Sequence, residues 1–262
     1  MGKSLIFFDV DGTILDASNR VPESAINAIC AARTNGHICV INTGRPYSHL
    51  DPAVRTIGFD GYICSCGQHI IMDHQCILYK RPSAALCQQI VQLIRQCKLD
   101  AVFEGEDGVW FHSTCPIRTE VQDSMDYFAQ RGFDTAQPVD RPDFRFDKFC
   151  VWSNPSSDTA LFLGETARFF TIIDRGSDLY ECVLPECSKE TGMHKIMELT
   201  GIPAEACYAI GDSTNDLPML RAVPHSIAMG NAPQEVQAAA EFVTDPVHLD
   251  GLFRALSHYG LI

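Results

Sequence analysis

The sequence predicts an α/β protein with a parallel-sheet core and a second α/β domain inserted into that core. At both ends of the chain, short apolar segments of strand length alternate with longer segments of helical periodicity, the pattern of βαβ units. The middle of the chain has a different order of helices and strands, with apolar residues for a core of its own. We therefore expect residues 1–81 and 187–262 to form the core domain and residues 82–186 an inserted cap domain.

The first part of the chain shows the alternation most clearly. LIFF is an unbroken apolar run of strand length. A later segment carries alanine and isoleucine at helical spacing and ends at Asn35-Gly36, which is a helix stop signal. We expect strands at 5–8, 37–42 and 61–65, helices at 22–35 and after Pro46, and a hairpin over 68–80.

The rest of the chain divides at Pro82 and again after Lys189, where the first rhythm returns. In the inserted domain we expect helices at 84–98, 116–131 and 157–168, and strands near 101–104, 109–111, 147–152, 170–173 and 179–183. In the last part we expect strands at 207–211, 225–229 and 241–243, and helices at 191–200, 215–223, 233–240 and the end of the chain.

Composition and charge exclude several classes of protein. Hydrophobic residues make up 46% and charged residues 20% of the sequence, as in ordinary globular proteins. A formal net charge of −13 repels nucleic acid and anionic lipid, and no segment approaches the roughly 18 apolar residues of a membrane span. The twelve cysteines are scattered, as expected for reduced thiols that pack as small apolar groups. We expect a cytoplasmic protein, a monomer or a weak homodimer, that binds neither nucleic acid nor membrane.

Polar residues follow three of the expected core strands. Asp9 and Asp11 come directly after the first strand. Thr43 follows the second, and Asp212 follows the strand CYAIG. Because ligands of open parallel sheets bind at the carboxyl ends of the strands, we expect these side chains at one edge of the sheet. Lys189, just before a predicted helix, adds a cation to the same edge.

Crowded carboxylates indicate a cation site. Carboxylates repel one another unless a cation neutralises them, and Mg²⁺ prefers oxygen ligands that include substrate phosphate. A calcium loop of the EF-hand type is excluded, because its sixth and twelfth positions counted from Asp9 hold Ile14 and Arg20. Beside a metal, one carboxylate can attack as a nucleophile while a second transfers protons. Asp9 and Asp11 are the candidates for these two roles.

Four motifs carry a family resemblance. DVDGT, NTGR, the lone Lys189 and GDSTND, in this order, resemble the motifs of the haloacid dehalogenase-like superfamily. The insertion between the second and third motifs is similar to the α/β cap of its Cof-type phosphatases, class IIB. The C-terminal segment that begins GNAPQEV also resembles this subfamily. The resemblance covers both core segments and implies a Mg²⁺-dependent phosphatase on a Rossmann-like core.

The resemblance also implies a role for each residue that matches a family motif. The implied roles are Asp9 as nucleophile, Asp11 as general acid/base, Thr43, Gly44 and Lys189 as phosphate-binding groups, and Asp9, Asp212 and the backbone carbonyl of Asp11 as Mg²⁺ ligands. Asn215 and Asp216 would orient Lys189 or a metal-bound water, and either could contact the metal directly.

The sequence departs from the family's pattern at two places. Relatives often have Asn-Gly-Ala after the third strand, where this chain has CGQ at 66–68, so any substrate contact from that asparagine is lost. Relatives also often have glycine after the motif lysine, where Glu190 follows Lys189. Lys189 stays the best candidate for the motif lysine, and Lys195 is the weaker alternative because it lies well inside the predicted helix.

Four residues keep two interpretations each. Arg45 could bind phosphate or form a surface salt bridge, and Asn231 could face the active site or cap a helix. Asp212 and Asp216 could instead serve only the start of the next helix, as an N-cap and as a first-turn acid.

These observations predict a function. We expect a Mg²⁺-dependent phosphomonoester hydrolase that acts on small phosphorylated molecules, with sugar phosphates favoured, through an aspartyl-phosphate intermediate. A sugar phosphomutase would use the same groups and differ in its product. A sensor that only binds sugar phosphates is a further alternative, although binding alone does not need a proton-transfer acid such as Asp11.

Overall fold

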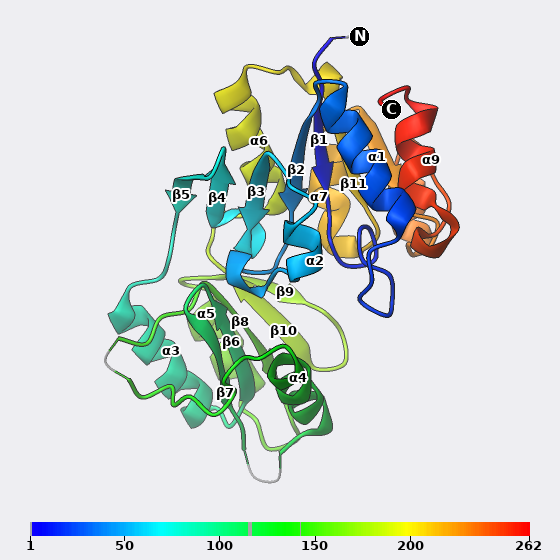
Figure 1. Ribbon diagram of the computed structural model, residues 1–262. Helices are drawn as coiled ribbons and strands as arrows, with labels where there is room; N and C mark the ends of the chain where they lie inside the picture. Colours follow the sequence, from blue (N-terminus) through cyan, green and yellow to red (C-terminus); the bar gives the residue numbers. More distant parts are fainter. Residues whose placement is uncertain (1, 115–116, 142) are drawn as a thin grey trace. The chain divides into compact units, whose positions relative to one another are not determined.

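The chain folds into two compact units in a computed structural model that describes residues 2–114, 117–141 and 143–262 (Figure 1). Unit 1 combines both ends of the chain, Met1–Tyr79 and Cys187–Ile262. Unit 2 is the continuous segment Lys80–Glu186. In the part of the chain that is described, no helix combines the length and the apolar character that a membrane crossing requires.

Unit 1 is built on a sheet of eight strands. Its first five strands are β1 (Leu5–Phe8), β2 (Ile38–Asn42), β3 (Gly61–Cys64), β4 (His69–Met72) and β5 (Gln75–Tyr79). After unit 2 the chain adds β11 (Cys207–Gly211), β12 (His225–Ala228) and β13 (Phe242–Val243). The spatial order is β13-β12-β11-β1-β2-β3-β4-β5. All neighbours from β13 to β3 are parallel, and β4 and β5 add an antiparallel hairpin.

The strand order places β1 at the point where the sheet changes direction. The chain first moves outward from β1 through β2 and β3, and it later returns to the other side of β1 as β11. Leu5 is consequently paired with both Ile38 and Cys207. Such a switch point opens a crevice at the carboxyl ends of the strands, where ligands of doubly wound sheets bind. The predicted α/β class with a parallel core sheet is confirmed.

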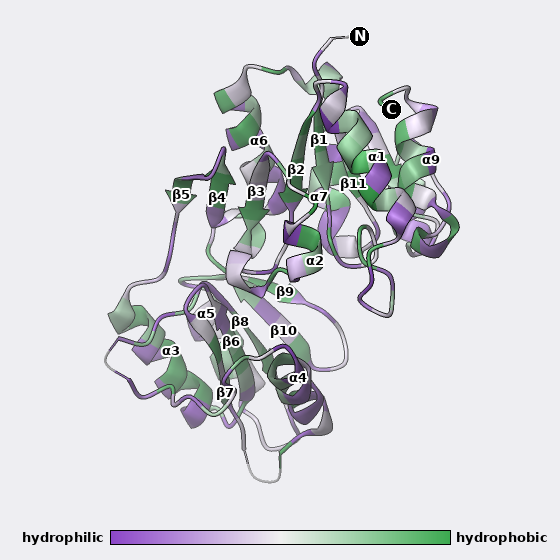
Figure 2. Cartoon of the chain, in the orientation of Figure 1, coloured by the Kyte–Doolittle hydropathy of each residue, from purple (hydrophilic) through white to green (hydrophobic). Residues whose placement is uncertain are grey.

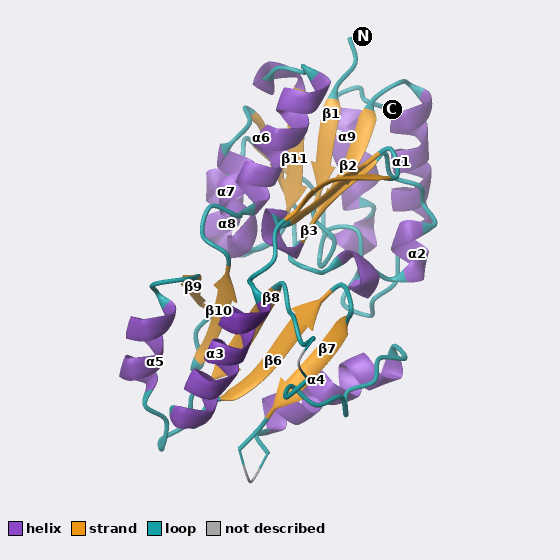
Figure 3. Ribbon diagram, turned by 90° about the vertical axis from the view of Figure 1, so that its left-hand side faces the viewer, coloured by secondary structure: helices purple, strands orange, loops and turns teal. Residues whose placement is uncertain are grey.

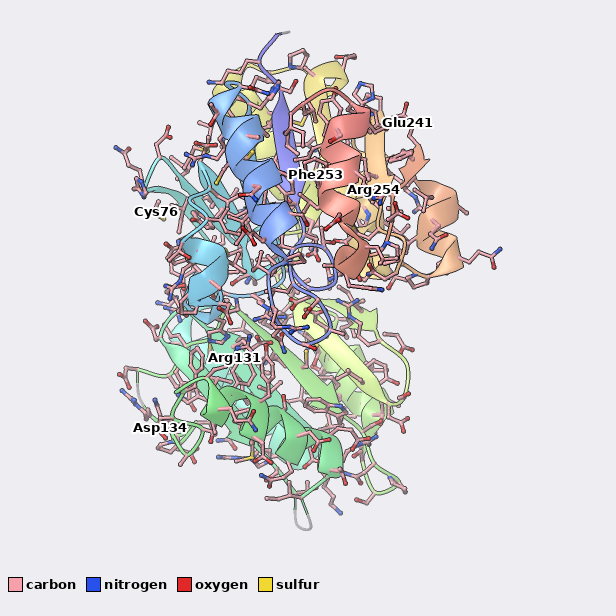
Figure 4. All side chains as sticks on the ribbon, turned by 45° about the vertical axis from the view of Figure 1, so that its right-hand side comes forward. Cys76, Arg131, Asp134, Glu241, Phe253 and Arg254 are labelled. Carbon is pink, nitrogen blue, oxygen red and sulfur yellow. The ribbon has the colours of Figure 1, made fainter. Side chains whose placement is uncertain are left out.

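Helices cover both faces of this sheet (Figure 3). On one face lie α1 (Glu23–Thr34), α2 (Pro52–Arg55) and α9 (Gly251–His258), and on the other α6 (Lys189–Thr200), α7 (Leu217–Arg221) and α8 (Gln234–Ala239). Phe253 and Arg254 lie on the outer side of α9 (Figure 4), and Phe253 is partly exposed there. The central strands are fully buried and strongly apolar (Figure 2), as parallel strands covered on both faces must be.

The helix expected over residues 215–223 is wrong in form. Residues Thr214–Asp216 form a 3₁₀ turn, and α7 follows only over Leu217–Arg221. The carboxylate of Asp216 folds back to accept hydrogen bonds from the backbone N–H groups of Asp212 and Ser213. Together with the N-cap Ser213, these bonds form a capping box at a helix start whose first turn has the tighter 3₁₀ form, and apolar periodicity does not reveal that form.

Unit 2 has its own antiparallel sheet, in the order β7-β6-β8-β10-β9. Its strands are β6 (Asp100–Gly105), β7 (Gly108–His112), β8 (Lys148–Trp152), β9 (Thr171–Asp174) and β10 (Leu179–Val183). Its helices are α3 (Ala84–Gln96), α4 (Thr119–Gln130) and α5 (Thr159–Thr166). The helix expected from 116 begins at Thr119, and residue 116 itself lies outside the described residues.

Two apolar clusters hold unit 2 together, one on each face of its sheet. A cluster rich in phenylalanine joins the sheet to α3 and α5, with Phe103, Phe146 and Phe149 completely buried. A smaller cluster joins the other face to α4 through Val121 and Phe128. Unit 2 therefore has a core of its own, which is what independent folding of an inserted segment requires.

Candidate active site

The predicted site residues gather at the carboxyl edge of the unit 1 sheet. Asp9 follows β1, and Thr43 follows β2. Asp212 follows β11, the other neighbour of β1. Lys189 is the first residue of α6, whose N-cap is Ser188. The switch point of the sheet thus brings together three strand ends and one helix start that are far apart in sequence.

Lys189 lies at the centre of this group. Its Nζ is 2.5 Å from an oxygen of Asp9 and 2.5 Å from an oxygen of Asp216. The lysine side chain is only 3% exposed. Burial alone would lower the pKa of Lys189, but the charges of Asp216 and Asp9 raise it above its usual value. Lys189 is therefore a fixed cation that bridges the two carboxylates.

The alternative lysine does not reach the site. Lys195 lies further along α6, is 41% exposed, and pairs with Glu198 three residues on at 2.7 Å. That contact is an ordinary surface ion pair of a helix. Lys189 at the start of α6, which the sequence favoured as the motif lysine, is the buried one of the two.

Asp216 anchors the turn that follows β11. One of its oxygens accepts a bond from Lys189, and the other accepts from the N–H groups of Asp212 and Ser213 at 3.0 and 2.9 Å. A side chain at Gly211 would put its Cβ 2.6 Å from Cγ of Asp216, so glycine leaves the room this carboxylate needs. Asp216 is completely buried, and it is more than a first-turn helix acid.

Asp212 lies next to the DVDGT loop. Its carboxylate accepts two long hydrogen bonds, each of 3.4 Å, from Oγ1 of Thr13 and from Nδ2 of Asn231. The loop requires glycine at position 12 for two reasons. Its φ of +79° is strained for other residues, and a Cβ there would be 2.1 Å from an oxygen of Asp212. Burial and the nearby Asp216 raise the pKa of Asp212 to about 6. The N-cap of the next turn is Ser213, so Asp212 is not a capping residue.

The carboxylates of Asp9, Asp212 and Asp216 fit a divalent cation. Each offers an oxygen, and these oxygens lie within 4.8 Å of one another. Lys189 offsets one of the three negative charges, so the group keeps an excess of negative charge. Burial and the charge of Asp216 accordingly raise the pKa of Asp9 well above its usual value, against the opposing effect of Lys189. Hard oxygen donors with uncompensated negative charge are the chemistry that Mg²⁺ binds.

Asp11 and Arg45 form a second, more exposed group. The Arg45 guanidinium donates to both oxygens of Asp11, through Nε at 2.8 Å and through Nη2. The side chain of Asp11 is 52% exposed and that of Arg45 is 15% exposed. Arg45 is thus in a salt bridge, and its partner is the second aspartate of DVDGT. Thr43 is buried, with Oγ1 accepting the Arg45 N–H at 3.2 Å, and Gly44 beside it is half-buried.

The two candidate asparagines have different positions. Asn215 accepts a hydrogen bond from Oγ of Ser213, within the turn that Asp216 anchors. Asn231 donates to the carbonyl of Gly12 at 2.9 Å and accepts from the N–H of Val247 at 3.1 Å. The helix-cap interpretation of Asn231 is wrong, because α8 begins after Pro233. Asn231 links loops that are distant in sequence, so its sequence context marked it as a candidate but could not predict these contacts.

A tight turn after β3 supports the start of α6. Ser65, Cys66 and Gly67 have positive φ values of 49°, 54° and 87°. The N–H of Cys66 donates to the carbonyl of Thr43 at 3.2 Å, which ties this turn to the loop after β2. A Cβ at Gly67 would lie 2.3 Å from the carbonyl oxygen of Ser188. The backbone at Gly67 therefore approaches the N-cap residue directly before Lys189 more closely than any side chain allows.

Gly67→Ala is expected to lower the free energy of unfolding by about 1–3 kcal/mol, because alanine is strained at this φ and meets the Ser188 carbonyl. Gly36→Ala is the matched control, since Gly36 also has a positive φ of 90° but has nothing within 4 Å of an added Cβ. Urea unfolding of both variants measures the difference. Equal losses would show that the close approach to Ser188 has no energetic effect.

Comparisons with known proteins agree with these motifs. Residues 6–256 match the family described as haloacid dehalogenase-like hydrolase. YkrA of Bacillus subtilis is 29% identical over 274 residues, with all of both chains covered. Phosphatase YwpJ, also of Bacillus subtilis, is 25% identical and covers 97% of this chain and 99% of its own.

Solved structures share the fold. A hypothetical protein from Geobacillus kaustophilus superposes with a TM-score of 0.85 at 24% identity, over all of both chains. A sugar phosphatase of HAD subclass IIB superposes with a TM-score of 0.81 at 23% identity, over 99% of this chain and 100% of its own. Together with the family match over residues 6–256, which spans all four motifs, these findings confirm the predicted resemblance: the chain belongs to the haloacid dehalogenase-like hydrolase family.

Proposed function

We propose that this protein is a Mg²⁺-dependent phosphomonoester hydrolase that works through an aspartyl-phosphate intermediate. The observation that carries the proposal is the cluster of buried Asp9 and Asp216 with half-buried Asp212 at the switch point of the sheet, where Lys189 bridges Asp9 and Asp216. The aspartate after β1 is paired with a fixed cation beside a candidate metal site. Family membership supports a hydrolase, and relatives such as YwpJ are named phosphatases.

Asp9 and Asp212 are the proposed side-chain ligands of the metal, together with the backbone carbonyl of Asp11. Both oxygens of Asp216 already accept hydrogen bonds, so we assign Asp216 to orienting Lys189 and the turn after β11. When bound, Mg²⁺ supplies charge neutralisation, which lets a phosphate dianion approach these carboxylates. Thr43, Gly44 and Lys189 are the proposed groups that bind the phosphoryl oxygens.

The proposed reaction has two steps. In the first, an oxygen of Asp9 attacks phosphorus, the bond to the substrate oxygen breaks, and Asp11 gives its proton to that leaving oxygen. In the second, water attacks the aspartyl phosphate, Asp11 takes a proton from that water, and the bond between phosphorus and Asp9 breaks. Inorganic phosphate is released, and both aspartates return to their starting states.

We propose unit 2, residues 82–186 by the sequence pattern, as the cap that selects the substrate. Subclass IIB relatives that share the fold include a sugar phosphatase, and YitU of Bacillus subtilis is named as a phosphatase of a phosphoribitylamino-uracil. Both names refer to phosphate esters of sugars or sugar-like chains. A small phosphorylated molecule with several hydroxyl groups, with sugar phosphates favoured, is therefore the proposed substrate class.

Removal of the metal is expected to stop phosphate release. We would incubate the protein with sugar phosphates, nucleotides, flavin mononucleotide, pyridoxal phosphate and an aryl phosphate, with Mg²⁺ and with EDTA. Release that requires Mg²⁺, and that returns when Mg²⁺ replaces EDTA, supports the proposal and identifies the preferred class. Conversion of a sugar phosphate into an isomer would indicate a mutase, and complete inactivity with Mg²⁺ would contradict the proposed function.

A further inference from the structure

The bidentate contact between Arg45 and Asp11 has no part in the reaction as proposed above. Nε and Nη2 of Arg45 each donate to a different oxygen of Asp11. Two parallel N–H···O bonds fix the orientation of a carboxylate, which a lysine or a single hydrogen bond does not do. The contact joins the loop after β1 to the loop after β2, 34 residues further along the chain.

Arg45 is the better-anchored member of this pair. Its backbone N–H donates to Oγ1 of Thr43 at 3.2 Å, and its carbonyl accepts from the N–H of Ser65 at 2.9 Å. Its Nη1 donates to the carbonyl of His49 at 3.4 Å. Its side chain is 15% exposed, against 52% for Asp11. Arg45 is therefore fixed by its surroundings, and it sets the orientation of the Asp11 carboxylate.

We propose that Arg45 is a positioning residue for Asp11. Between the two chemical steps, it keeps the carboxylate of Asp11 in the orientation needed to take a proton from water. This inference rests on the proposed function, because it assigns a task within that reaction. An exposed pair between two flexible side chains contributes little, but here one partner is anchored and the other follows the proposed nucleophile by two residues.

The chemistry needs such a group after the first step. When Asp11 has given its proton to the leaving oxygen, it carries a negative charge next to the new aspartyl phosphate. The guanidinium of Arg45 balances that charge and keeps both oxygens in place. In the second step, one of these oxygens accepts a proton from the attacking water, and the bond between phosphorus and Asp9 breaks. Loss of Arg45 should therefore slow the second step more than the first.

The test is pre-steady-state kinetics of Arg45→Met with dinitrophenyl phosphate and Mg²⁺. Dinitrophenolate leaves without needing a proton, so formation of the aspartyl phosphate should stay fast while its hydrolysis slows. We expect kcat to fall by about 10- to 100-fold, at most the lower end of what a general base contributes, because Arg45 acts only through Asp11, and we expect KM to fall in parallel. The burst of dinitrophenolate should rise above that of the wild type, toward one per active site.

Two further variants separate positioning from stability. Arg45→Lys keeps the charge but cannot bind both oxygens, so it should show an intermediate burst and an intermediate kcat. Arg33→Met removes another bidentate arginine–aspartate pair of unit 1, with Asp60, which joins α1 to the chain before β3. It should lower the melting temperature without increasing the burst.

Three results would overturn the inference. An unchanged kcat in Arg45→Met would make the pair a surface salt bridge only. A raised KM with no increase in the burst would instead make Arg45 a phosphate-binding residue. In both cases the wild type is active and the proposed function stands. A wild type that releases no dinitrophenolate with Mg²⁺ would overturn the proposed function, and this inference with it.

Discussion

Asp9→Asn is expected to abolish Mg²⁺-dependent turnover, with a loss of at least about a thousandfold in kcat, because an amide oxygen cannot form the aspartyl-phosphate intermediate. The fold should survive, since asparagine has the same shape and its oxygen can still accept a hydrogen bond from Lys189, which keeps its contact with Asp216. Phosphate release and circular dichroism measure the two effects. Acid-quenched protein after incubation with labelled substrate should retain label in the wild type alone.

Asp73→Asn is the matched control for this experiment. Asp73 is an exposed aspartate in the turn between β4 and β5 of the same unit, so its replacement should leave kcat unchanged. Substantial turnover by Asp9→Asn in a preparation free of wild-type enzyme would rule out Asp9 as the nucleophile. If turnover were lost together with the folded state, the loss could be due to unfolding, and the position of the label in the acid-quenched wild type, found by peptide mapping, would then decide.

Lys189→Met is expected to lower the free energy of unfolding by about 3–5 kcal/mol, the largest loss among the variants described. Urea unfolding with EDTA present measures it. Methionine fills nearly the same space but carries no charge, so Asp9 and Asp216 would face each other in a buried site without their cation. Turnover should be lost as well, because Lys189 is also a proposed phosphate-binding group.

Lys195→Met, in the same helix, is the control for Lys189. Its partner Glu198 is 70% exposed, and surface pairs of this kind change stability by less than about 0.5 kcal/mol. Equal stability of the two variants would mean that the Lys189 contacts do not neutralise the buried carboxylates. Added Mg²⁺ should restore part of the stability lost in Lys189→Met, because a divalent cation offsets the same negative charge.

Residues that lie next to a regular element could be predicted from the sequence. Asp9, Thr43 and Asp212 each follow an apolar strand, and strand ends of a parallel sheet meet at one edge. The position of Lys189 at a helix start was visible in the same way. Their roles in the reaction stay predictions, but their place in the fold followed from local patterns together with the strand order.

The contacts between these residues could not be predicted. Lys189 reaches Asp9 across 180 residues of sequence, and Asn231 reaches Gly12 across 219. Such contacts depend on how loops from several strands approach one another, which periodicity does not describe. The 3₁₀ form of Thr214–Asp216 could not be predicted for a related reason, because apolar periodicity does not distinguish a 3₁₀ turn from the first turn of an α-helix.

The pairing of β1 with β11 also governs when the site can exist during synthesis. Leu5 leaves the ribosome before its partner Cys207, which follows some two hundred residues later. Until then one edge of β1 lacks its neighbour, and Asp9 lacks both Lys189 and Asp216. Unit 2 is continuous in sequence and has its own core, so it can fold on the nascent chain in the meantime. The carboxylates of Asp9, Asp212 and Asp216 can therefore come together only after the segment through Asp216 has been synthesised.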